Sequence, residues 1–320
     1  MPHDSIDQLP KPPPWRVFDE EAEPITPWVD QTDAEQRSGE NYRPDREIVE
    51  LVNAALYLRR PLLVTGRPGT GKSTLATAIA HELRLGRVLR WNITSRVAVR
   101  DGLYQYDPLA RLYRASRRAE EPEKADEDVG RFIRLGPLGT ALLPGERPRV
   151  LLIDEIDKSD LDLPNDLLTI FEDGAYEIPE LVRQAEQAAD AYVMTADSTE
   201  RVLVHEGRVR CRSFPIVIMT SNDEREFPPA FLRRCIQATL AQPDGAKLNE
   251  IVGAHLADIA DESADLIDEF LDRRDPGELA TDQLLNAIYL TDRAGRSGGV
   301  DRRQLARSVM AYLTRRPDDR

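Results

Sequence analysis

The sequence predicts an α/β fold, in which a parallel sheet is flanked by helices and is followed by an all-helical region. Two observations lead to this prediction. Short apolar runs alternate with helical patterns between residues 44 and 240, and near-continuous apolar strands are typical of parallel sheets that are covered on both faces. After about residue 241, apolar residues recur only at helical spacing. We therefore divide the chain into segment 1–43, an α/β domain over 44–240 and a helical lid domain over 241–320.

The first 43 residues are rich in proline, acidic and polar side chains. A segment of this composition buries too little apolar area to fold by itself. It is either a mobile tail or a strap that is anchored to this subunit or to a neighbouring one. The candidate anchors are Trp15, Phe18 and Trp28.

The expected elements of the α/β domain follow one another in a regular order. They are a helix with its apolar face at 48–56, strand 62–65, helix 72–83, strand 87–93, strand 149–153, helix 162–172 and strand 215–220. Inserts at 94–148 and 174–210 interrupt this order. We expect the charged stretch 117–128 to be mobile and 174–210 to be irregular. In the lid, helical stripes cover 248–259, 284–289 and 305–313.

The strongest chemical signal is a loop between strand 62–65 and helix 72–83. It reads Gly66-Arg67-Pro68-Gly69-Thr70-Gly71-Lys72-Ser73 and matches the G-x-x-x-x-G-K-[ST] pattern of phosphate-binding loops. The glycines let successive backbone N–H groups point at phosphate oxygens, and the helix N-terminus adds partial positive charge. We expect residues 66–74, Thr74 included, to bind nucleotide, with Lys72 at the β- and γ-phosphates and Ser73 on Mg²⁺. The alternative is a plain glycine-rich turn before a helix.

Polar residues follow two of the later strands. Strand 149–153 ends in Asp154-Glu155, and strand 215–220 is followed by Ser221-Asn222. We expect Asp154 to bind Mg²⁺, Glu155 to orient and polarise the attacking water, and Asn222 to reach the γ-phosphate or that water. The alternatives are a helix-capping acid pair and an ordinary turn asparagine.

The stretch 227–235 has two prolines at the expected start of a helix and Arg233-Arg234 at its end. Paired arginines at this place could reach the ATP site of a neighbouring subunit. The alternative is a pair of solvated or salt-bridged arginines.

Together, the loop, the Asp-Glu strand end, the strand-end asparagine, the paired arginines and the helical lid resemble an AAA+ ATPase over roughly residues 44–320. The resemblance implies ATP and Mg²⁺ as cofactors, a sensor role for Asn222, a trans-acting arginine finger and a ring of six copies. The two inserts and the stretch from Ser221 to Cys235 are most similar to the MoxR-type group, whose members act with von Willebrand factor A domain partners. In place of that group's Asp-Glu-Ile-Asn-Arg, this chain has Asp-Glu-Ile-Asp-Lys at 154–158. Its nearest match to a sensor-2 arginine is Arg302.

Composition excludes several other classes. The net charge of −14 disfavours simple binding of nucleic acid, and no apolar run is long enough to span a membrane. Two unpatterned cysteines and the lack of a signal segment lead us to expect a cytoplasmic protein without a cysteine metal site. The chain has neither the Asn-Lys-x-Asp of GTPases nor the Leu-Ser-Gly-Gly-Gln of transporter ATPases.

The function expected from the sequence is ATP hydrolysis that drives the remodelling of a protein partner. Two alternatives stay open, a motor associated with nucleic acid and a nucleotide-gated scaffold with little hydrolysis. Tyr104 and Tyr106 in the first insert are either residues that grip a polypeptide or packed aromatic side chains.

Overall fold

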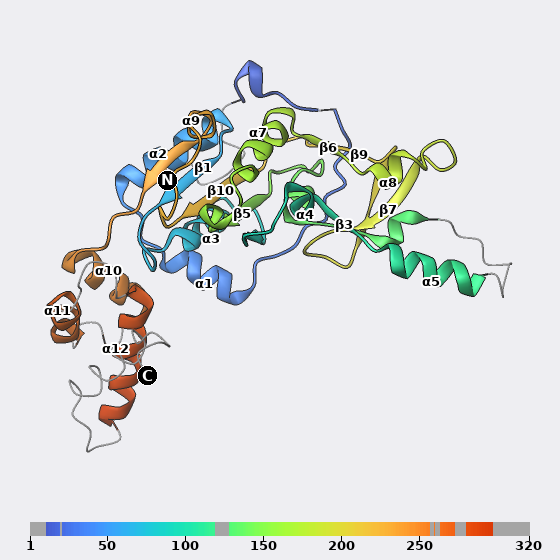
Figure 1. Cartoon of the computed structure of the whole chain (residues 1–320). Helices are drawn as coiled ribbons and strands as arrows, with labels where there is room; N and C mark the ends of the chain where they lie inside the picture. Colours follow the sequence, from blue (N-terminus) through green and yellow to red (C-terminus); the bar gives the residue numbers. More distant parts are fainter. Residues whose placement is uncertain are drawn as a thin grey trace.

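The computed structural model describes residues 11–19, 21–118, 128–256, 259, 263–272 and 280–296. A five-stranded parallel sheet forms the middle of the molecule (Figure 1). Its strands, in spatial order, are β11 (Ile236–Thr239), β1 (Leu62–Thr65), β10 (Ile216–Ser221), β5 (Val150–Asp154) and β2 (Leu89–Asn92). The α/β prediction is confirmed, and the four expected strands are present. Strand β11 was missed by the sequence analysis.

Helices cover both faces of this sheet. Helices α2 (Arg46–Leu58) and α3 (Lys72–Glu82) pack against one face, with side chains that alternate along β1, β5 and β10. Helices α6 (Pro137–Ala141) and α7 (Leu163–Asp173) lie against the other face. Their buried side chains belong to an apolar cluster that is larger than the one on the α2 and α3 side. Burial on both faces explains the continuous apolar runs of these strands.

The second insert is ordered, so the prediction of an irregular segment over 174–210 was wrong. It contains β6 (Ala175–Glu177), α8 (Pro179–Val182), β7 (Asp190–Met194), β8 (Arg201–His205) and β9 (Arg208–Arg210). The first insert contains α4 (Val99–Leu103), β3 (Tyr104–Tyr106), α5 (Pro108–Arg118), η3 (Val129–Phe132) and β4 (Ile133–Leu135), in addition to α6. Of the stretch that we expected to be mobile, residues 119–127 lie outside the described residues.

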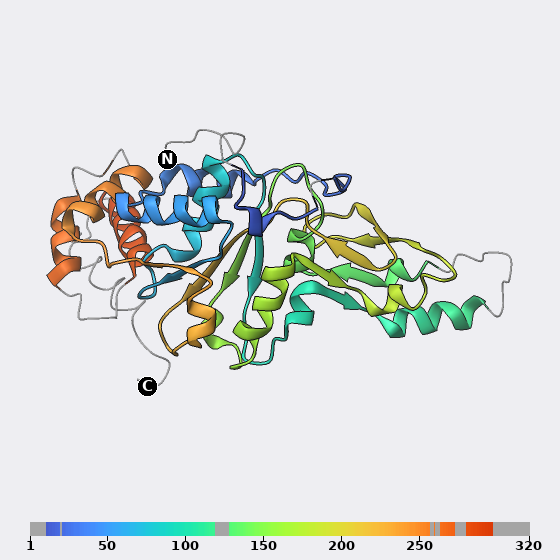
Figure 2. The same ribbon diagram turned by 90° about the horizontal axis from the view of Figure 1, so that it is seen from above.

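The two inserts pair with each other. Strands β3, β4, β7 and β8 form a four-stranded sheet in that order, and β6 pairs antiparallel with β9. This second sheet and α5 extend from one end of the central sheet, while the C-terminal helices lie at the other end (Figure 2). The inserts are therefore far from the edge of the molecule where the lid helices lie.

The N-terminal segment lies along the body through most of its described residues. After η2 (Pro14–Arg16), the Phe18 ring stacks on Phe214 at 5.4 Å between centroids. Helix α1 (Asp33–Asn41), which begins with a capping box of Thr32 and Glu35, packs so closely on α3 that a Cβ at Gly39 would lie 2.5 Å from the Cβ of His81. Trp15 and Trp28, the other expected anchors, are 76% and 55% exposed.

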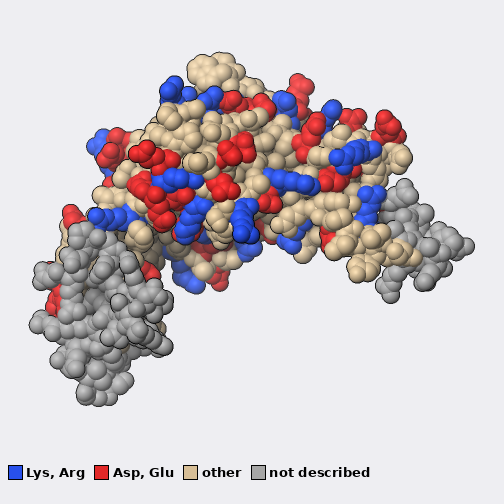
Figure 3. Space-filling model, in the orientation of Figure 1, with Lys and Arg blue, Asp and Glu red and all other residues tan. Residues whose placement is uncertain are grey.

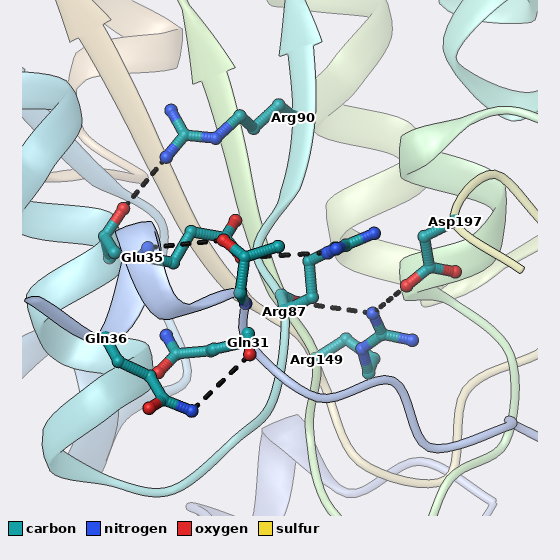
Figure 4. Close-up of polar contacts among 9 residues, drawn as sticks. Gln31, Glu35, Gln36, Arg87, Arg90, Arg149 and Asp197 are labelled. Carbon is teal, nitrogen blue, oxygen red and sulfur yellow. Dashed lines mark hydrogen bonds and ion pairs between the residues drawn. The ribbon is translucent and has the colours of Figure 1, made fainter. Parts of the chain in front are cut away.

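A chain of polar contacts joins this segment to β2, β5 and the second insert (Figure 4). Glu35 lies 3.7 Å from Arg87, whose carbonyl accepts a hydrogen bond from Arg149 at 3.2 Å. Arg149 in turn forms a buried ion pair with Asp197, in the loop after β7. Because both partners are more than nine-tenths buried, this pair ties the insert to the base of the central sheet.

The C-terminal region is helical as far as it is described. It contains α10 (Gly245–His255), α11 (Ala264–Asp272) and α12 (Thr281–Arg296), which share a small apolar cluster. The stripe expected at 305–313 lies outside the described residues. The boundaries at 43/44 and 240/241 remain predictions.

Candidate nucleotide-binding site

The loop at residues 66–73 connects β1 to α3, as expected. Its three glycines all have positive φ angles, of 143° at Gly66, 75° at Gly69 and 86° at Gly71. Residues with a side chain rarely adopt this backbone conformation, and loops built in this way present backbone N–H groups to anions. A Cβ at Gly69 would also lie 2.3 Å from the Cβ of Ala280, so the loop touches the start of the α12 region. Arg67 and Pro68 are exposed at the tip, and Thr70 and Thr74 are half-buried.

Lys72 is the central cation of the site. The residue is only 7% exposed, and its ammonium group donates to the carbonyls of Gly66 at 2.7 Å and Arg67 at 2.9 Å, and to the Oδ1 of Asn222 at 2.8 Å. Burial lowers the pKa of Lys72, and the Asp157 carboxylate is the strongest of the nearby charges that oppose this shift. The structure thus brings together two of the predicted residues, Lys72 and Asn222, that are 150 positions apart.

A second cluster joins the start of α3 to the ends of β5 and β10. The Oδ1 of Asp154 accepts hydrogen bonds from the Ser73 hydroxyl at 2.7 Å and the Thr220 hydroxyl at 2.5 Å. The Thr220 oxygen also accepts the backbone N–H of Glu155 at 2.9 Å. Ser73 and Asp154 are therefore positioned together, with hard oxygen atoms of the kind that Mg²⁺ prefers.

Glu155 lies at a strained turn. Its backbone is left-handed (φ 59°, ψ 49°), which is unfavourable for a residue with a side chain and is often found at functional positions. The turn ends β5 and leads into η4 (Ile156–Lys158). The carboxylate of Glu155 accepts a hydrogen bond from the Lys158 ammonium at 2.7 Å, and both side chains are 43% exposed.

The loop after β10 is held by a buried carboxylate. Asp157, which is 5% exposed, accepts the backbone N–H groups of Asn222 at 2.8 Å and Glu224 at 3.2 Å through its Oδ2. Its Oδ1 has no hydrogen-bond partner within the described residues. Asp157 therefore fixes the backbone position from which the Asn222 amide reaches Lys72.

The two arginines lie on the surface after the short helix α9 (Pro229–Leu232), away from this cluster. Arg234 pairs with Glu172 at the end of α7 and donates to the Ala230 carbonyl at 3.2 Å. The exposed guanidinium of Arg233 has no hydrogen bond or ion pair with the described residues, although its carbonyl accepts from Arg60 at 3.0 Å. In the described part of the chain, neither side chain forms a hydrogen bond or ion pair with the phosphate loop of its own chain.

Three contributors were missed by the sequence analysis: Thr220, Asp157 and Lys158. Thr220 directly precedes the predicted Ser221-Asn222, and Asp157 and Lys158 lie two and three positions after the predicted Glu155. Their positions close to predicted residues were the available signal, but the partners of Thr220 and Asp157 lie more than 60 positions away in the chain. Arg302, the candidate sensor-2 residue, lies outside the described residues.

The two aromatic candidates of the first insert do not form an exposed pair. Tyr104 is 4% exposed, and its hydroxyl donates to Glu180 at 2.8 Å, which together with burial raises its pKa to about 12. Tyr106 is half-buried and accepts from Arg111 at 3.2 Å. The burial of Tyr104 rules out a role for it in gripping a polypeptide in this conformation.

The donor set fits a magnesium-bound nucleoside triphosphate. The site combines a loop built on three glycines, a buried lysine and a hydroxyl–carboxylate pair, which correspond to phosphate and Mg²⁺ chemistry. Both charge signs are mixed over the coloured part of the face in Figure 3, without a broad basic surface. Within the described ranges, no helix is long and apolar enough to cross a membrane, and Cys211 and Cys235 are free and buried.

Comparisons with known proteins agree with this geometry. Residues 61–235, more than half of the 320 residues, match the family described as AAA domain (dynein-related subfamily). The match begins just before β1 and ends just after Arg234, so it includes every candidate site residue except Arg302. A comparison with curated proteins finds no match. The chain therefore belongs to the AAA domain family, in its dynein-related subfamily, whose members are ATP-driven proteins of the P-loop type.

Proposed function

We propose that this protein hydrolyses ATP and uses the energy to remodel a protein partner, as a MoxR-like motor that acts in a ring. The observation that carries the proposal is the convergence of Lys72, Asn222, Ser73, Asp154 and Glu155 at one edge of the central sheet. A simple phosphate-binding turn would need only the loop. The added carboxylates and amide are the groups that hydrolysis requires.

The phosphate loop supplies binding. Lys72 would exchange its contacts with the carbonyls of Gly66 and Arg67 for phosphate oxygens, while the backbone N–H groups of the loop and the N-terminus of α3 face the same charge. Ser73 and Asp154 would hold Mg²⁺, which neutralises charge on the phosphates when it is bound. Arg302 is the candidate for a further contact from the lid.

Glu155 and Asn222 supply the groups for hydrolysis. Glu155 would accept a hydrogen bond from the attacking water, provided that its carboxylate leaves Lys158. Asn222, held by Asp157 through its backbone, would turn its amide from Lys72 toward the γ-phosphate or the water. Phosphoryl transfer depends mainly on such positioning, so the strained turn at Glu155 is consistent with a precise task.

The surface position of Arg233 and Arg234 supports a site that is shared between subunits. A guanidinium group that is exposed and not bonded to the phosphate loop of its own chain is available to the phosphate loop of a neighbour. AAA+ proteins commonly form hexameric rings, and we extend that arrangement to this chain. The two inserts, 94–148 and 174–210, and the resemblance over residues 221–235 favour a MoxR-like role and a partner with a von Willebrand factor A domain.

The decisive experiment compares ATP hydrolysis and ATP binding in one substituted site. Glu155→Gln keeps the shape of the side chain but cannot polarise water as a carboxylate does, so it should bind ATP normally and lose at least about 100-fold in turnover. Lys72→Ala should lose ATP binding itself, measured by calorimetry. Glu47→Gln, an exposed substitution on α2, is the matched control. Wild-type turnover in Glu155→Gln, or no hydrolysis by the wild-type chain, would refute the proposal.

A further inference from the structure

Helix α5 of the first insert carries its large apolar side chains on an uncovered face. Leu109, Leu112 and Tyr113 recur at helical spacing, so they lie on one side of the helix. They are 65%, 64% and 73% exposed, and together we call them the α5 stripe. Single exposed apolar residues are common on proteins, but neighbouring ones on one face mark an interaction surface.

The described contacts of α5 with the rest of the chain come from other residues. The helix begins after Asp107, whose carboxylate accepts the backbone N–H of Ala110 at 2.8 Å, and Arg111 donates to the Tyr106 hydroxyl at 3.2 Å. Ala110 is half-buried, whereas all three residues of the stripe are exposed. A surface helix normally turns its apolar face toward the core, so the orientation of α5 is reversed.

A helix as short as α5 depends on packing for its stability. It runs from Pro108 to Arg118, and isolated helices of fewer than about 12–15 residues are marginal in water. Most helical stability in proteins comes from the burial of an apolar face. Since the described chain does not bury the α5 stripe, a partner that covers it would stabilise the helix.

The charge of α5 is opposite to that of the chain. The helix contains four arginines and no acidic residue, whereas the whole chain has a net charge of −14. The arginines are Arg111, Arg114, Arg117 and Arg118. The helix lies in the part of the molecule that extends away from the central sheet (Figure 2). A surface that complements α5 is therefore both apolar and acidic.

Three occupants of the α5 stripe fit these facts less well than an acidic partner protein. Residues 119–127, which follow α5, are acidic but contain no leucine, isoleucine, valine or aromatic residue that could cover it. A second α5 would bring only a stripe of the same small size, whereas stable interfaces use about 20–30 residues a side. An anionic bilayer is an extended surface, so it would face the acidic chain as well as α5 and would be repelled.

We propose that α5 docks an acidic amphipathic helix of a partner protein, whose apolar face covers the α5 stripe and whose carboxylates face the arginines. Helices recognise one another in this way through anchors at i, i+3 and i+4. A single helix can contact α5 alone, so it gains the local attraction without approaching the rest of the acidic chain.

The place of α5 in the chain connects the docked helix to the nucleotide site. The first insert follows β2, whose last residue, Asn92, lies beside Asp154 in the parallel sheet. A change at this strand end during ATP hydrolysis would move the insert together with the docked helix. This consequence rests on the proposed function, whereas docking on α5 does not.

The test measures docking on the full chain without nucleotide. The probe is a fluorescent synthetic peptide with about three repeats of Leu-Glu-Ala-Leu-Leu-Glu-Glu, which is long enough to form an acidic amphipathic helix. We expect saturable binding in fluorescence anisotropy that weakens as the salt concentration rises. A control peptide in which glutamine replaces every glutamate should bind more weakly.

Substitutions place the peptide on the stripe. Leu112→Ser and Tyr113→Ser should each weaken binding by about tenfold or more, the effect of one apolar side chain that is no longer covered. Arg114→Gln should weaken binding less, and its effect should disappear at high salt. Leu161→Ser, at the same 64% exposure in the loop after η4, and the exposed Arg46→Gln are the matched controls. All five side chains are exposed, so unfolding should match the wild type.

Two parallel measurements test the other occupants. One is sedimentation with vesicles of phosphatidylcholine and phosphatidylglycerol in equal parts, and the other is self-association of the chain by analytical ultracentrifugation. The proposal is overturned if the peptide does not bind, or if Leu112→Ser and Tyr113→Ser both bind it as tightly as the wild type. Vesicle binding or self-association that is lost in Leu112→Ser, without peptide binding, would also overturn it and identify the bilayer or a second copy instead. None of these results depends on ATP hydrolysis, which is measured separately.

Discussion

Replacing Asp157 with asparagine tests how the site holds its strand-end amide. In the wild type, one carboxylate oxygen accepts two backbone N–H groups, those of Asn222 and Glu224, while the other oxygen is buried without a partner. The amide of Asp157→Asn can present only its oxygen to these groups, and its NH₂ must take the place of the unpartnered oxygen. Two charge-assisted hydrogen bonds then become neutral ones.

The magnitude follows from that exchange. Hydrogen bonds to a charged group contribute about 1.5–3 kcal/mol and neutral ones about 0.5–1.5 kcal/mol. Part of the difference is offset, because a buried charge is removed. We expect the free energy of unfolding to fall by about 1–2 kcal/mol. A displaced Asn222 should reduce ATP turnover by about 10–100-fold, as misplacements near 1 Å do.

The pH dependence distinguishes this role from a loss of stability alone. Asp157 is the strongest of the carboxylates that raise the pKa of Lys72 against the effect of burial. Removing its charge lowers the pKa of Lys72 further, so Lys72 loses its proton at a lower pH. ATP binding should therefore fail at a less alkaline pH than in the wild type.

The assay is ATP affinity and turnover across the alkaline range, with denaturant unfolding in parallel. Asp160→Asn, an exposed substitution three positions away, is the control and should behave as the wild type. An unchanged alkaline midpoint together with wild-type turnover in Asp157→Asn would refute the reasoning.

Three further predictions concern neighbouring contacts. Lys158→Met breaks a half-exposed ion pair with Glu155, so the free energy of unfolding should change by less than about 1 kcal/mol and ATP turnover should stay the same or rise. A loss of turnover as large as that in Glu155→Gln would show that Lys158 itself acts in the site. Thr220→Val leaves the Glu155 N–H without its acceptor, which should cost about 1–3 kcal/mol in unfolding and reduce turnover more than ATP affinity; unchanged melting would contradict this. Asp197→Ala leaves Arg149 buried without a carboxylate, which should cost about 3–5 kcal/mol in denaturant unfolding, whereas Asp190→Ala, at an exposed pair, should cost less than about 1 kcal/mol.

The parts of the fold that could be predicted from sequence are those with local signals. The loop at 66–73 has a fixed pattern, and the strands that carry Asp154 and Asn222 are buried on both faces, so their sequences are continuously apolar. Parallel strands place their C-terminal ends at one edge, which is why the loop, the Asp-Glu pair and the asparagine were expected together.

Other parts depend on pairing that no local pattern specifies. Strand β11 has the sequence Ile-Gln-Ala-Thr, is four residues long and is defined by its register beside β1. In the second insert, β7 and β8 do alternate between buried and exposed residues, but each is short, and they become strands by pairing with each other and with β4. The sequence analysis treated 174–210 as irregular and assigned no strand to 236–239, because such short segments give only a weak local signal.

The same limit applies to the site. The sequence places Asp157 close to Asp154-Glu155 but does not show its role, because its partners are the backbone N–H groups of residues 222 and 224, more than 60 positions away. From the sequence, Tyr104 was either a gripping residue or a packed aromatic side chain, and its burial and its hydrogen bond to Glu180 favour the second. Side chains whose roles depend on one distant contact are the ones that a pattern cannot assign.

The last prediction concerns which arginine serves the neighbouring subunit. Arg234 is paired with Glu172, so it must first break an ion pair, while the Arg233 side chain is exposed and free of partners within the described residues. We therefore expect Arg233→Ala to keep ATP binding and lose about 10³-fold or more in turnover, the effect of a trans arginine in related chemistry. Arg234→Ala should lose less turnover and a few tenths to 1 kcal/mol of stability, as for an exposed pair.

Mixing separates a shared site from a local effect. Arg233→Ala and Lys72→Ala chains should each be inactive alone, because one lacks the arginine and the other lacks the phosphate contact. In a mixed ring, some interfaces join the intact phosphate loop of one chain to the intact arginine of the other, so part of the activity should return. A mixture of Lys72→Ala with Glu155→Gln is the control, since both defects lie on the loop side of the interface and no junction between them is complete. If subunits exchange and activity does not return, or if wild-type specific activity stays constant across a dilution that dissociates the ring into single chains, then Arg233 does not complete a neighbouring site and all catalytic groups must lie within one chain.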